Sequence, residues 1–123
     1  MALLHPVGEH TIDHERLNKL HSGDRRQIIS VFQLFLDEVL PDFLELEQGM
    51  QQQQWPEVAD MAHKIVPWVG MVGLTSLETE LRSLEKQAKH NPTTQSMTAS
   101  WDRFKAGLDR TVPLLRQELA RME

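Results

Sequence analysis

Apolar residues recur at steps of three and four along most of this chain, and no other property of the sequence narrows the possible folds as far. Such a period places the apolar side chains on one face of an α-helix, whereas a half-exposed strand alternates polar and apolar residues. No stretch of the sequence combines that alternation with the flanking turn residues of a strand. The sequence therefore predicts an all-α protein.

Capping and turn residues divide the first half of the pattern. Asp13 is a suitable N-cap for a short helix, which the residues His21-Ser22-Gly23 would end. Asp24 is expected to cap a long second helix that runs to the glutamine-rich residues 51–54. Pro41 lies inside this helix and should kink it, because proline lacks the N–H that an α-helical hydrogen bond needs.

The second half of the chain contains three further helical patterns. One helix is expected to begin near Pro56, since proline suits the first turn. Thr75 and Glu78 have the spacing of a capping box, which predicts the start of the next helix. Asn91-Pro92 separates that helix from the last one, in which Pro113 predicts a bend.

The expected fold is an antiparallel, up-down-up-down four-helix bundle with a short N-terminal helix, because short connections make successive helices antiparallel. Residues 1–11 are expected to form a flexible N-terminal segment and residues 12–123 the bundle. The predicted core consists of the apolar positions at helical spacing, which are Leu17, Leu20, Ile28, Phe32, Phe35, Val39, Phe43, Leu46, Met50, Val58, Ala62, Ile65, Val69, Leu77, Leu81, Leu84, Ala88, Met97, Trp101, Phe104, Leu108, Val112, Leu115 and Leu119.

Composition narrows the classes of function. A chain of 123 residues fits a single domain, and it has no cysteine, which excludes disulfides, zinc–thiolate sites and thiol catalysis. No apolar run is long enough to indicate a signal peptide or a membrane-spanning helix. The net charge is −5 and the basic residues are scattered, which argues against a nucleic-acid surface. These properties favour a protein partner or a small ligand.

His63 is expected on the exposed side of the third predicted helix, which begins near Pro56. At about 100° per residue, it falls well away from the apolar stripe between residues 58 and 69. Its predicted neighbours on this side are small or apolar, and they are Ala59, Val66, Pro67 and Gly70. Because a solvent-facing surface usually carries charged residues, we interpret these four as a docking surface around a nucleophilic imidazole.

Around His63 the chain reads Ala62-His63-Lys64-Ile65, followed by Gly70-x-x-Gly73-Leu74 and then by Leu77 and Leu84-Glu85. This pattern resembles that of the histidine phosphotransfer (HPt) domains found in bacterial phosphorelays and hybrid sensor histidine kinases. Further similarities lie at Gly23-Asp24, at Phe35-Leu36 through Leu40-Pro41 and at Trp55, so that the resemblance extends from Ile12 to Leu119.

The resemblance implies that His63 accepts a phosphoryl group and exchanges it with the aspartate of a receiver domain. It implies a phosphorelay intermediate rather than an autonomous enzyme, with no cofactor of its own and with Mg²⁺ on the partner receiver domain. The expected partners are receiver domains, and the chain is either a separate protein or part of a hybrid histidine kinase. We expect it in the cytoplasm, including as the C-terminal domain of a membrane-bound sensor kinase, without membrane contact of its own.

Two residues depart from the family pattern. Val66 stands where these domains usually have a lysine, and Pro67 stands where they usually have a glycine. The lysine that steadies the phosphoryl group is therefore missing from its usual place. The predicted replacements are Lys64, which adjoins His63, and two residues of the following antiparallel helix, Arg82 and Lys86.

Two alternatives belong to other classes of function. The departures at Val66 and Pro67 are compatible with a helical interaction module that keeps the fold but no longer accepts phosphate. Asp60-x-x-His63 has the carboxylate-x-x-histidine spacing of di-iron bundles, but such a centre needs a second pair of this kind, which the chain lacks. Phosphorylation with a small donor would separate the relay from the interaction module.

Overall fold

Helices account for nearly all of residues 11–123, which are the residues that the computed structural model describes. The elements are α1 (His14–Leu20), α2 (Arg25–Leu34), the π-helical turn η1 (Phe35–Val39), α3 (Asp42–Gln51), α4 (Trp55–Met71), α5 (Thr75–Lys89) and α6 (Thr94–Met122). No strand occurs within this range. The predicted all-α class is therefore confirmed, while most of the predicted flexible segment lies outside the described residues.

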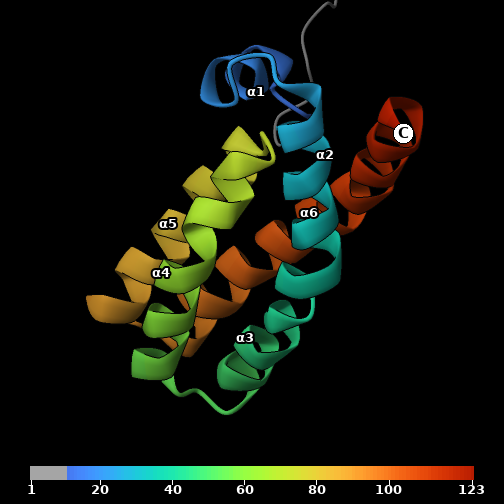
Figure 1. Ribbon diagram of the computed structural model, residues 1–123. Coiled ribbons are helices and arrows are strands. Elements are labelled where there is room, and N and C mark those ends of the chain that lie inside the picture. The colour runs from blue at the N-terminus through green and yellow to red at the C-terminus, as the bar shows by residue number, and fades with distance from the viewer. Residues whose placement is uncertain (1–10) are drawn as a thin grey trace, which may run out of the picture.

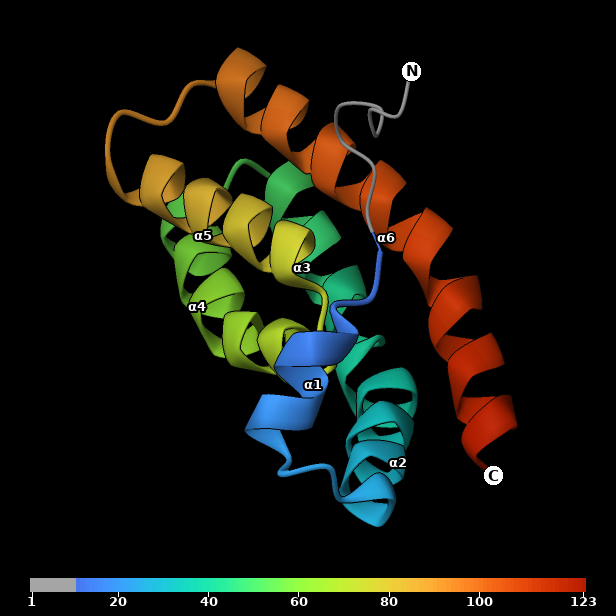
Figure 2. The same ribbon diagram turned by 90° about the horizontal axis from the view of Figure 1, so that it is seen from above.

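The long helices form the expected bundle (Figure 1). The first of its four rods consists of α2, η1 and α3 in succession, and the others are α4, α5 and α6. Figure 2 shows α4 and α5 side by side and the N-terminal half of α6 next to α5, and Figure 1 shows α1 at one end of the bundle. No helix of the described residues is long and apolar enough to cross a membrane.

Two of the predicted helix starts are confirmed. The carboxylate of Asp13 accepts a hydrogen bond from the backbone N–H of Arg16, and that of Asp24 accepts from Arg26. These contacts satisfy N–H groups that have no partner within their own helix. Both aspartates are therefore N-caps.

The capping box predicted at Thr75 and Glu78 is wrong. The N-cap of α5 is Leu74, and no side chain caps this end. The hydroxyl of Thr75 and the carboxylate of Glu78 instead accept hydrogen bonds from the guanidinium of Arg16 on α1. Glu78 binds Arg16 rather than the backbone at the start of its own helix, because a hydrogen bond between charged groups is stronger than a neutral one.

Pro41 interrupts the first rod as predicted, and the interruption takes the form of the π-helical turn. The N–H of Leu40 donates to the carbonyl of Phe35, five residues earlier, at 2.9 Å. Pro41 cannot continue the hydrogen-bond ladder, and α3 begins directly after it. By contrast, α6 remains helical through Pro113, and in Figure 2 its C-terminal half turns away from the direction of its N-terminal half.

The core lies between the four rods. All predicted core positions are buried except Val112 and Leu119, which are partly buried, and Leu20, which is 49% exposed. Leu20 was expected inside, but α1 covers only one end of the bundle and buries Leu17 there, against the turn at Gly73. That turn needs glycine because its backbone has a φ of +78°.

Candidate functional site

His63 lies on α4 with its side chain 75% exposed, which confirms its predicted outward position. Its Nδ1 atom is 2.9 Å from Oε2 of Glu85 on α5. Since α4 and α5 form an antiparallel hairpin closed by the turn at Gly73, a residue of the second helix is brought back to the level of His63. The imidazole is thus open to solvent on one side and held by a carboxylate on the other.

Glu85 is well covered, with only 13% of its side chain exposed. The same oxygen that contacts His63 also accepts a hydrogen bond from Nζ of Lys89, at 2.9 Å. Burial raises the pKa of Glu85, but the hydrogen bonds from Lys89 and His63 outweigh this effect, and the net pKa is lower than usual. Glu85 is therefore an ionised carboxylate at neutral pH.

The charge of Glu85 decides which nitrogen of His63 carries the proton. An ionised carboxylate can only accept hydrogen bonds, so Nδ1 of His63 must be the donor. In the neutral ring Nε2 is then unprotonated and keeps its lone pair. The site thus presents one nucleophilic nitrogen to solvent while fixing the orientation of the ring.

A second ionic cluster lies nearer the hairpin turn. Glu78 is 8% exposed and binds Arg16 of α1 at 2.5 Å and Arg82 of its own helix at 3.0 Å. The hydrogen bond from Arg16 is the largest influence on the pKa of Glu78 and lowers it, against the opposing effect of burial. A Cβ at Gly70 would lie 2.7 Å from Oε2 of Glu78, so this glycine leaves room for the cluster.

The apolar docking surface predicted around His63 is largely wrong. Of its four members only Pro67 is exposed, whereas Ala59, Val66 and Gly70 are buried. The prediction assumed that α4 buries a single stripe, but this helix packs against α3 and η1 on one side and against α5 on another. Gly70, for example, lies against Glu78 of α5 and Arg16 of α1.

The predicted phosphoryl-stabilising residues lie in different surroundings. Lys64 and Lys86 are exposed and make no ion pair with any residue from 11 to 123. Arg82 is exposed but its guanidinium binds Glu78. None of these three forms a hydrogen bond or an ion pair with His63.

Glu85 and Lys89 were not predicted as site residues. Leu84-Glu85 belongs to the motif on which the resemblance was based, and Glu85 and Lys89 have the i, i+4 spacing of a helical ion pair. These signals place both side chains on one face of α5. They do not show that His63 is opposite, because that depends on how α4 and α5 are aligned.

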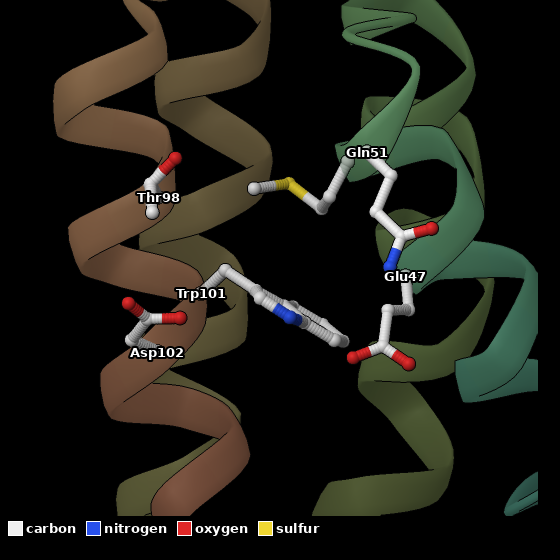
Figure 3. Close-up of a pocket in the computed structure, with 6 residues that line it drawn as sticks. Glu47, Gln51, Thr98, Trp101 and Asp102 are labelled. Atoms are coloured by element: carbon white, nitrogen blue, oxygen red, sulfur yellow. The ribbon is translucent and has the colours of Figure 1, made fainter.

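The hollows and possible metal ligands of residues 11–123 were compared with the position of His63. Within residues 11–123 no three histidine or acidic side chains are grouped so as to hold a metal ion. A hollow of about 250 Å³ lies between α3 and α6, and Figure 3 shows the Trp101 ring reaching across it toward Glu47 and Gln51. None of its lining residues comes from α4 or α5, so this hollow is separate from the site at His63.

Comparison with protein families agrees with the resemblance that the motif around His63 indicates. The family model described as Hpt domain matches residues 30–123, about three quarters of the chain. The matched region extends from α2 to the end of the chain and includes His63, Glu85 and Lys89. No curated protein and no solved structure was found to match the chain.

Proposed function

Because this chain belongs to the Hpt domain family, which implies histidine phosphotransfer in phosphorelays, we propose that it carries a phosphoryl group on His63 and exchanges it with receiver-domain aspartates. The observation that carries the proposal is the contact of Nδ1 of His63 with Glu85, which leaves the lone pair of Nε2 available in the neutral ring of a side chain that is 75% exposed. An exposed imidazole suits this role because the phosphoryl donor is itself attached to a protein surface.

The transfer can be written without a proton leaving the site. The lone pair of Nε2 attacks the phosphorus of an aspartyl phosphate, the new P–N bond forms, and the P–O bond to the aspartate breaks. The aspartate leaves as a carboxylate with the bonding electrons. His63 keeps its proton on Nδ1, so its ring becomes positively charged. The reverse reaction passes the phosphoryl group to the next aspartate.

Glu85 is proposed as the positioning residue of this reaction. Its carboxylate accepts the Nδ1 proton and therefore fixes both the tautomer and the direction of Nε2. Its negative charge also opposes the positive charge that develops on the ring during transfer. Since Glu85 is only 13% exposed, this interaction is weakened less by solvent than one between freely exposed groups.

The proposed partner is a receiver domain that approaches the exposed side of α4. His63, Lys64 and Pro67 are among the exposed residues of α4, and Pro67 lies one turn beyond the histidine. The Mg²⁺ of the exchange is expected on the receiver. We further propose a cytoplasmic setting, with the chain either a separate relay protein or attached to a hybrid histidine kinase.

Phosphorylation of the purified chain tests the function directly. We expect incubation with phosphoramidate, or with a phosphorylated receiver, to give one acid-labile adduct that mass spectrometry locates at His63. His63→Gln should abolish it while leaving the helical circular dichroism and the melting temperature nearly unchanged. The matched control is His90→Gln, since His90 is also an exposed histidine and lies at the end of α5. Labelling that persists in His63→Gln would contradict the assignment.

A second candidate function is an interaction module that has lost phosphoacceptor activity. Val66, which replaces the usual lysine and is buried, is the observation in its favour. Such a protein would bind a receiver domain in a pull-down assay without acquiring an acid-labile adduct. The same labelling experiment therefore separates the two functions.

A further inference from the structure

We propose that Lys89 supplies the cation that stabilises the phosphoryl group on His63, and this inference rests on the proposed function. Phosphoryl oxygens carry negative charge, and an ammonium group close to the accepting nitrogen would stabilise both the transition state and the product. Val66 cannot provide that charge. The position of Lys89 makes it the best placed cation.

Lys89 and His63 share one atom of Glu85. Nζ of Lys89 and Nδ1 of His63 each lie 2.9 Å from Oε2 of that carboxylate. The ammonium therefore stands no more than two hydrogen-bond lengths from the imidazole ring. Half of the Lys89 side chain is exposed, and an ammonium has three N–H groups, so Lys89 keeps donors beyond the one that binds Glu85.

The other cationic side chains of α4 and α5 are less well placed to bind a phosphoryl group on His63. The guanidinium of Arg82 is already bound to the buried Glu78. Lys64 and Lys86 make no ion pair within residues 11–123, so each would lose the free rotation of a long side chain on binding a phosphoryl oxygen. Lys89 is held beside His63 by Glu85 before the reaction begins, and this lowers the entropic cost of its contact.

The change in charge on His63 during transfer also favours a contact between Lys89 and the phosphoryl group. Before transfer, the negative Glu85 is balanced by Lys89, and the proposed reaction starts from the neutral form of the His63 ring. After transfer the ring is positive and its N–H becomes a stronger partner for the same carboxylate oxygen. The positive ring then balances the charge of Glu85, so the ammonium of Lys89 can leave this carboxylate and donate to the phosphoryl oxygens. The main partner of Glu85 thus changes from the Lys89 ammonium before transfer to the His63 ring after it.

The experiment labels the full chain with phosphoramidate, a small donor that needs no docking surface. Lys89→Met should lower the initial labelling rate about three- to tenfold, as expected for a half-exposed contact between charged groups. Lys89→Arg should restore most of it. The matched control is Lys19→Met, because Lys19 forms the same kind of i, i+4 pair with Glu15 on α1, far along the chain from His63.

A titration followed by phosphorus NMR distinguishes a direct contact from an indirect effect through Glu85. If Lys89 donates to the phosphoryl group, the second phosphoryl pKa should be higher in Lys89→Met than in the unaltered chain, because removing a cation disfavours the doubly charged form. Unchanged labelling and an unchanged titration in Lys89→Met would overturn the inference. So would a loss found instead in Lys64→Met or Lys86→Met. Absence of labelling in the unaltered chain would contradict the proposed function itself.

Discussion

His63 and Glu85 are 22 residues apart in the sequence and are joined by a single hydrogen bond of 2.9 Å between α4 and α5. The orientation of the imidazole therefore depends on how these two helices are aligned. Both side chains are on helices rather than loops, which limits their movement relative to each other. The consequences of this arrangement can be tested at several positions.

Glu85→Gln should slow phosphorylation of His63 by a small donor about three- to tenfold, because the amide oxygen can still accept the Nδ1 proton but no longer opposes the charge on the ring. Glu85→Ala should be slower still, since it also releases the ring orientation. Initial labelling rates measure both effects, with the exposed Glu45→Gln on α3 as the control. Equal rates for Glu85→Gln and the unaltered chain would show that the charge of Glu85 is not used.

The free energy of unfolding should fall as the pH drops below about 4.5. Glu78 and Glu85 both have pKa values below the ordinary 4.5, so the unfolded chain binds protons more readily than the folded one in this range. Their stabilising contribution is complete above the unfolded pKa and is lost as the pH falls through the folded one. Glu78→Gln should flatten this dependence in urea unfolding measured between about pH 6 and pH 3. An unchanged slope in that variant would contradict the assignment.

Gly70→Ala should have opposite effects on stability in two backgrounds. In the unaltered chain the new Cβ would lie 2.7 Å from Glu78 and 2.9 Å from Arg16, so the ion pair must shift and the protein should be destabilised. In the Glu78→Ala background the carboxylate is absent and no longer holds the flexible Arg16 side chain beside Gly70. Alanine should then stabilise α4 by about 0.5–1 kcal/mol through its helix propensity. Chemical denaturation of the four proteins measures this cycle, and additive effects would disprove the steric explanation.

Pro67→Glu should slow transfer from a phosphorylated receiver at least several-fold, because it places a charge on the exposed surface that the partner is proposed to cover. Labelling by phosphoramidate separates docking from chemistry, since the small donor does not need this surface. Ala106→Glu, at an exposed position of α6, is the control for an added charge elsewhere. If Pro67→Glu slows neither reaction, the receiver docks at another face.

The sequence pattern was sufficient for the features that depend on one helix at a time. Helical spacing located the buried stripes, and the caps at Asp13 and Asp24 follow from local hydrogen bonding. The outward position of His63 follows from the same geometry. Leu20 shows the limit of the approach, because a regular pattern cannot indicate that α1 is too short to be covered on that side.

Features that depend on the packing of two helices could not be predicted in this way. Val66 and Gly70 were expected on the exposed side of α4 but are buried, and Gly70 lies against Glu78 of α5 and Arg16 of α1. Glu78 was assigned to a local cap, but its partner Arg16 is 62 residues earlier in the chain. The contact of Glu85 with His63 likewise requires the alignment of α4 and α5, which no local pattern contains.

In the proposed relay, the carboxylate oxygen shared by His63 and Lys89 also affects how readily the phosphoryl group is given up. Any group that stabilises the cationic phosphohistidine favours phosphorylation of His63. The same group lowers the group-transfer potential of the phosphohistidine and therefore slows transfer to the next aspartate. A carboxylate that interacted with the His63 ring alone would favour the phosphorylated form most strongly. Because Lys89 already balances Glu85 before loading, the carboxylate gains less when the ring becomes positive. This keeps loading and unloading closer in free energy, which is what a reversible carrier between two aspartates requires.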